Sequence, residues 1–169
     1  MNFRIILGIF LSFASLNSFA EDCGYMPPPG YIEIDDSIGL KLSVSIEKTD
    51  CNQALLSLRI HHSEINSNKP IYVVDNKLGA FFGSRAQNPT KAISQSLADE
   101  LLEEIKVKKV AGNFGSGSRC LHWIPEIYLD RLKSKNRNML SYRWRSNEIR
   151  YIAYVEEIGQ MVVIAQCSK

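Results

Sequence analysis

The chain has 169 residues, of which 45% are hydrophobic and 22% are charged, and its formal net charge is +2. This composition is typical of a single folded domain and not of a disordered chain. Because basic and acidic residues nearly balance, we do not expect nucleic acid as a partner.

The first 20 residues have the pattern of a secretory signal peptide. Arg4 precedes a short apolar run over 5–13, and small residues, Ser18 and Ala20, occupy the two positions that a signal peptidase reads. The run is too short to cross a bilayer, which needs roughly 20 residues. We predict cleavage after Ala20 and a single mature domain, residues 21–169, in the periplasm or outside the cell, with no membrane insertion.

All four cysteines belong to the mature chain. An even number in an exported protein predicts two disulfides, for which three pairings are possible. We favour Cys23 with Cys51 and Cys120 with Cys167. No CxxC pattern occurs, so we expect neither a zinc ribbon nor a thioredoxin-like redox site.

The first half of the mature chain predicts hairpins. An extended lead-in over 21–30 precedes a short edge strand over 31–34. Strict alternation of apolar and polar residues predicts a half-buried strand over 40–47 that returns as a second strand over 56–62, with Cys51 at the turn. A further hairpin is expected between 71–74 and 78–82.

The middle of the chain predicts one long amphipathic helix over 90–110. Asn88 or Thr90 can cap its start, and Gly112-Asn113 can end it. Its apolar stripe has helical spacing and is formed by Ile93, Leu97, Leu101 and Ile105. Residues after Pro125 suggest a short helix, although a strand is an alternative.

The last thirty residues predict a three-stranded antiparallel meander. A turn at Ser146-Asn147 would place Arg143 opposite Arg150, and a turn ending at Gly159 would place Ile152 opposite Ile164. The strand over 149–155 is apolar on both faces and should therefore be central. Together these elements predict an α+β fold that is mainly antiparallel sheet, with N-terminal hairpins, the C-terminal meander, one covering helix and two disulfides.

No catalytic pattern is found. His61 and His62 would point to opposite faces of a strand and cannot hold one metal ion together, and His122 stands alone. The glycine-rich stretch 112–118 lacks the residues of a phosphate-binding loop, and no GxSxG window occurs. We therefore expect no metal, no cofactor and no enzymatic activity.

Charge is unevenly distributed, since 21–50 is mainly acidic and 119–150 is mainly basic. Like charges directly opposite each other on paired strands are unfavourable. The predicted pairing of Arg143 with Arg150 would thus need either an internal acidic neighbour or acidic groups on a partner. The candidate binding residues are Arg143, Arg145 and Arg150, with Phe114 and Ser116 from the glycine-rich stretch.

The leading hypothesis is an exported, non-enzymatic protein-binding module, such as an inhibitor or immunity protein against a hydrolase or toxin. Its partner would be a protein, and the basic segment favours an acidic one. A small secreted hydrolase with a dispersed site and a subunit of a cell-envelope assembly are the alternatives.

Overall fold

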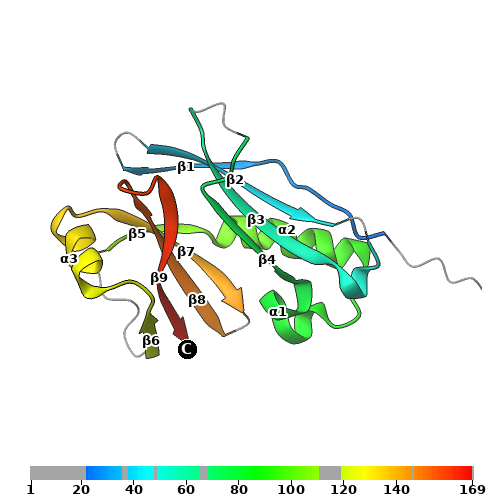
Figure 1. The fold of residues 1–169 in the computed structure, drawn as a ribbon. Helices are drawn as coiled ribbons and strands as arrows, with labels where there is room; N and C mark the ends of the chain where they lie inside the picture. The colour runs from blue at the N-terminus through cyan, green and yellow to red at the C-terminus, as the bar shows by residue number, and fades with distance from the viewer. Residues whose placement is uncertain are drawn as a thin grey trace, which may run out of the picture.

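The computed structural model describes residues 22–35, 38–47, 49–64, 68–110, 119–145 and 147–168. The predicted signal peptide and the candidate residues Phe114 and Ser116 lie outside the described residues. The fold is α+β and contains two antiparallel sheets (Figure 1). The predicted fold class is therefore confirmed.

The first sheet has four strands in the order β1-β2-β3-β4. These strands are β1 (Gly30–Asp35), β2 (Ile38–Ile46), β3 (Leu55–His62) and β4 (Tyr72–Lys77). A 3-10 turn, Cys51–Gln53, joins β2 to β3, which confirms the predicted hairpin. The apolar residues predicted to face inward are buried: Leu40, Leu42, Val44, Ile46, Leu56, Leu58 and Ile60.

The segment expected to form the second half of another hairpin is instead helix α1 (Leu78–Phe82), followed by a 3-10 turn, Gly83–Ala86. The prediction failed because Leu78, Phe81 and Phe82 have the i, i+3, i+4 spacing of a helix face, and all three are buried. β4 pairs with β3 instead.

The predicted long helix is also wrong. Helix α2 (Lys91–Glu104) has 14 residues and begins where Thr90 accepts a hydrogen bond from the backbone N–H of Ile93 at 3.3 Å. The chain leaves the helix at Ile105, and β5 (Lys106–Lys109) pairs with a strand of the second sheet. Pairing of this backbone with a neighbouring strand prevailed over the helical continuation that the apolar stripe suggested.

The second sheet has five strands in the order β5-β7-β8-β9-β6. Its other members are β6 (Arg119–His122), β7 (Asn138–Arg145), β8 (Glu148–Val155) and β9 (Gln160–Ser168). β8 is the central strand, as its two apolar faces predicted. Gly159 in the turn between β8 and β9 has a φ of 63°, the positive value for which glycine is suited.

Two bulges change the register that we predicted for the meander. One lies between Arg143 and Arg145, so that Tyr142 and not Arg143 is opposite Arg150. The other lies at Tyr151 and Ile152, so that Ile152 is opposite Val163 and not Ile164. An inserted residue on one strand moves every later side chain by one position relative to its partners.

The core has two parts. The larger cluster joins the inner faces of both sheets to α1 and α2, and includes Leu58, Phe81, Leu101 and Ile152. The smaller cluster lies on the opposite face of the second sheet, where helix α3 (Glu126–Ser134) contributes Leu129 and Leu132. None of the helices in the described ranges is long and apolar enough to cross a membrane.

The two disulfides have the pairing that we favoured. Cys23–Cys51 joins the N-terminal lead-in to the turn between β2 and β3, and Cys120–Cys167 joins β6 directly to β9. Two disulfides in one domain of this size are typical of proteins in an oxidising compartment.

Candidate functional site

One end of the second sheet collects arginine and tryptophan side chains on a single face. Residues directly opposite each other on paired strands share a face. One row across β6, β9, β8 and β7 is therefore Leu121, Gln166, Arg150 and Tyr142. The next row on the same face is Arg119, Ser168, Glu148 and Arg145. In Figure 1 this end, with β6 and the C-terminus of β9, points away from β1 and β2.

Arg150 is at the centre of this face, where it is stacked on Trp144 and has Trp123 nearby. Its guanidinium carbon lies 3.3 Å from the centroid of the Trp144 ring and 5.8 Å from that of Trp123. Trp144 is in turn held by Phe81 of α1, whose ring centroid is 5.7 Å away in an edge-on arrangement. The stack therefore runs from the core, through Arg150, to the surface.

A chain of polar contacts fixes the same arginine within the sheet. Nε of Arg150 donates to Oε1 of Gln166 at 3.1 Å, and Nε2 of Gln166 donates to Oε2 of Glu148 at 2.9 Å. That carboxylate oxygen is also 3.7 Å from Nε of Arg145. One carboxylate thus serves two arginines, directly for Arg145 and through Gln166 for Arg150.

A pair of tyrosines lies beneath Arg150. The hydroxyl groups of Tyr72 and Tyr142 are 2.6 Å apart and connect β4 of the first sheet to β7 of the second. Burial raises the pKa of both tyrosines, and the positive charge of Arg150 acts in the opposite direction on each. Both phenols therefore remain neutral at physiological pH, and they support the arginine without neutralising its charge.

The outer part of the face is apolar and exposed. Leu121 and Trp123 are 69% and 59% exposed. Single exposed apolar residues are ordinary, but two large ones close together, next to arginine, resemble the composition of a protein interface. We call Arg119, Leu121, Trp123, Arg145, Glu148 and Arg150 together the Arg150 surface.

The charges on the Arg150 surface do not balance. Three arginines accompany one glutamate. Arg145 has Glu148 as its partner, whereas neither Arg119 nor Arg150 forms an ion pair with any carboxylate in the part of the chain that the structure describes. A half-buried cation without a carboxylate partner is a favourable site for an anionic group.

The structure separates the arginines that the sequence placed together. Arg143 does not face Arg150. It lies at the edge of α2, where it pairs with Glu104 and with Glu100, the latter at 3.6 Å, and its guanidinium is 5.6 Å from the ring of Phe82. An internal acidic neighbour therefore balances Arg143. Arg145 and Arg150, by contrast, are brought together through Glu148.

Sequence reasoning missed Leu121 and Trp123. The available signal was two large apolar residues, one position apart from each other, between Cys120 and Pro125. The sequence predicts no strand for this segment, and so does not place Arg119 and Leu121 on one face.

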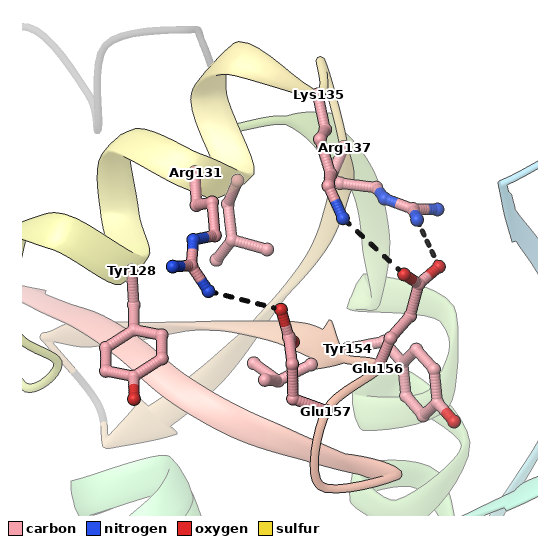
Figure 2. A pocket seen from close by; sticks show the side chains of 9 residues that line it. Tyr128, Arg131, Lys135, Arg137, Tyr154, Glu156 and Glu157 are labelled. Carbon is pink, nitrogen blue, oxygen red and sulfur yellow. Dashed lines mark hydrogen bonds and ion pairs between the residues drawn. The ribbon is translucent and has the colours of Figure 1, made fainter.

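A second charged group lies where the end of α3 meets the turn between β8 and β9 (Figure 2). Arg131 pairs with Glu157 at 3.5 Å, Lys135 with Glu156 at 3.7 Å, and Arg137 also with Glu156. A backbone hydrogen bond, with Lys135 and Arg131 adding to it, lowers the pKa of Glu157. These contacts pair opposite charges and hold α3 on the sheet, so we assign them a structural role.

The described residues contain no group of three or more His, Cys, Asp or Glu side chains that could hold a metal ion. His62 packs edge-on against Tyr154, with ring centroids 5.2 Å apart.

No family model, no curated protein and no solved structure matches this chain.

Proposed function

We propose that this chain is an exported, non-enzymatic protein-binding module that inhibits or neutralises a hydrolase or toxin outside the cytoplasm. The observation that carries the proposal is the Arg150 surface, where exposed Trp123 lies against a stacked arginine without a carboxylate partner. Tryptophan and arginine are the residues most enriched among those that dominate binding energy in protein interfaces.

The rigidity of this surface supports the same proposal. Cys120 is bonded to Cys167, so the strand that carries Leu121 and leads into Trp123 is covalently fixed to its neighbour. The stack of Phe81, Trp144 and Arg150 fixes the other side. A surface that is ordered before binding loses less conformational entropy when a partner binds.

The test is affinity capture with matched variants of the oxidised protein. Trp123→Ala removes the exposed ring of the surface, and Tyr31→Ala removes a ring of similar exposure, 68%, from β1 of the other sheet. Exported proteins of the producing organism are passed over the wild type and both variants, and the retained proteins are identified by mass spectrometry.

We expect at least one protein that the wild type and Tyr31→Ala retain and Trp123→Ala loses. Calorimetry on that purified protein should show binding to Trp123→Ala weaker by about tenfold or more, and its activity should fall when the wild type binds. If every retained protein binds Trp123→Ala as tightly as wild type, the Arg150 surface is not where this chain binds its partner, and the proposal fails.

A further inference from the structure

We infer that the Arg150 surface recognises an acidic side chain of its protein partner, an Asp or Glu carboxylate that lies next to an apolar residue. This inference rests on the proposed function and adds the chemistry of the contact. Three observations support it: an excess of positive charge, exposed apolar side chains beside that charge, and the geometry of the stacked arginine.

The excess of positive charge is local, and its three arginines come from three strands: Arg119 from β6, Arg145 from β7 and Arg150 from β8. Arg119 of β6 and Arg150 of β8 lie on the same face, in adjacent rows, and the only carboxylate of those rows is Glu148. Glu148 already contacts Arg145 and Gln166. Arg119 and Arg150 form no ion pair with a carboxylate of the described chain, and Glu148 reaches Arg150 only through Gln166, so an incoming carboxylate would add to a face on which arginines outnumber carboxylates three to one.

The stacking leaves the arginine able to bind such a group. The Arg150 guanidinium carbon lies 3.3 Å from the centroid of the Trp144 ring and 5.8 Å from that of Trp123, and the N–H groups of a guanidinium point outward along its edge. Nε donates to Gln166, and the hydroxyls of Tyr72 and Tyr142 also interact with this guanidinium, so a carboxylate would join partners that are all neutral. An arginine held in this way is pre-ordered, so a charge-assisted hydrogen bond to a carboxylate requires little further loss of side-chain freedom.

The exposed apolar side chains of the Arg150 surface indicate which kind of partner residue should lie beside the carboxylate. Leu121 lies in the same row as Arg150, and the centroid of the Trp123 ring is 5.8 Å from the Arg150 guanidinium carbon; both side chains are mostly exposed. An aliphatic or aromatic residue beside the acid would cover them. Excluding water in this way strengthens the interaction between the carboxylate and the arginines.

The amount of charge favours a protein over a nucleic acid. Nucleic-acid binding relies on many phosphate contacts from basic side chains. This chain has a formal net charge of only +2, and the Arg150 surface combines three arginines with one glutamate and two large apolar residues. That mixture fits one or two carboxylates with apolar neighbours.

The protein also contains its own reporter of this site. It has two tryptophans, Trp123 and Trp144, and both contact Arg150. Intrinsic tryptophan fluorescence therefore reports on the surroundings of Arg150, and on the contact of Trp144 with Phe81, without a label.

The experiment uses peptides as probes. Random twelve-residue peptides displayed on phage are selected on the oxidised wild-type protein, and clones that also bind Trp123→Ala are discarded. The most enriched peptide is synthesised together with a copy in which each Asp or Glu becomes Asn or Gln. Both are titrated while tryptophan fluorescence is recorded.

Three protein variants separate the site from general charge. Arg150→Gln and Arg119→Gln remove the two arginines without carboxylate partners. Arg59→Gln is the matched control, because it removes the same charge from an exposed position on β3 of the other sheet. Arg119→Gln keeps the test valid if loss of the stacked Arg150 disturbs folding, which circular dichroism would show.

We expect the enriched peptides to share an acidic residue beside an apolar one, and the amide copy to bind about tenfold more weakly or worse. The difference in affinity between the acidic peptide and its amide copy should be smaller in Arg150→Gln or Arg119→Gln and unchanged in Arg59→Gln. It should also decrease as salt is added. Enriched peptides without acidic residues, no enriched peptide at all, or equal binding of the acidic and amide copies would overturn the inference. The proposed function would remain supported in that case if a captured partner depends on Trp123. Failure of this inference and failure of the proposed function are therefore distinguishable.

Discussion

Nη2 of Arg143 in β7 lies 3.6 Å from Oε1 of Glu100 in α2. The same guanidinium also pairs with Glu104, one helical turn further on, and Glu100 pairs in addition with Arg85 beyond α1. Two carboxylates four residues apart on a helix repel each other. Arg143 lies between them and at the same time joins α2 to the second sheet, so this group helps to hold the two sheets in their relative position.

The first prediction concerns this arginine. Arg143→Gln should lower the free energy of unfolding by about 0.5 to 2 kcal/mol, because it leaves Glu100 and Glu104 facing each other without the shared cation. Urea denaturation measures the change, and Arg59→Gln, exposed on the first sheet, should stay within about 0.5 kcal/mol of wild type. Adding Glu104→Gln to the Arg143→Gln protein should recover part of the loss. An Arg143→Gln protein as stable as wild type would contradict this pairing.

The second prediction is a pH dependence. The hydrogen bond from Arg85, together with the charges of Arg85 and Arg143, lowers the pKa of Glu100 from its ordinary value of 4.5. The unfolded chain therefore takes up this proton at a higher pH than the folded protein does. The resulting stabilisation is complete above 4.5 and is lost as the pH falls through the lower pKa of the folded state.

Glu100→Gln should consequently be less stable than wild type near neutral pH, and the difference should narrow as the pH is lowered below 4.5. Urea midpoints measured from about pH 7 to about pH 3 give both quantities. A difference that stays constant over that range would show that the carboxylate of Glu100 is not held in its charged form by its arginines.

The third prediction tests the buried side of α2. Leu101 is fully buried, and Leu101→Ala should cost about 2 to 5 kcal/mol of unfolding free energy, the range for a leucine in a packed core. Ile93 belongs to the same predicted stripe but is 38% exposed, so Ile93→Ala should cost less than about 1 kcal/mol. Equal losses in the two variants would mean that α2 does not present Leu101 to the sheets.

Periodicity was sufficient where one face of an element is buried along its whole length. Alternation located β2 and β3 and every inward residue from Leu40 to Ile46, and the two apolar faces of 149–155 identified β8 as the central strand. Spacing of four identified α2 as a helix. These patterns are local consequences of burying one side of a regular element.

The errors arose where a tertiary contact decides between two local options. Lys106–Lys109 forms a strand and not the end of the helix because it pairs with β7. Leu78–Phe82 is helical because a helix buries both Phe81 and Phe82 in the core. A bulge leaves no mark in a pattern of period two. Because the bulge after Arg143 could not be predicted, the predicted register placed Arg143 opposite Arg150, where the two charges would repel. The stacking of Arg150 on Trp144, which forms the candidate site, was not predicted for the same reason.

The last prediction distinguishes the two disulfides by their local effect. Cys120–Cys167 and Cys23–Cys51 close sequence separations of 47 and 28 residues. Because loop entropy varies only with the logarithm of length, replacing either pair by alanine should destabilise the protein by a similar amount, roughly 4 kcal/mol at most. Global stability alone therefore does not separate their roles.

The backbone N–H of Trp123 separates them, because it donates to the carbonyl of Ile164 at 3.1 Å and lies just beyond the strand that Cys120 fixes. Removing Cys120–Cys167 should accelerate hydrogen exchange of this amide by more than the change in global stability explains, since β6 can then separate from β9 by itself. Removing Cys23–Cys51 should accelerate it only as far as global unfolding allows. If both variants accelerate the Trp123 amide equally, the Cys120–Cys167 bond does not pre-order the Arg150 surface, and rigidity ceases to support its role in binding.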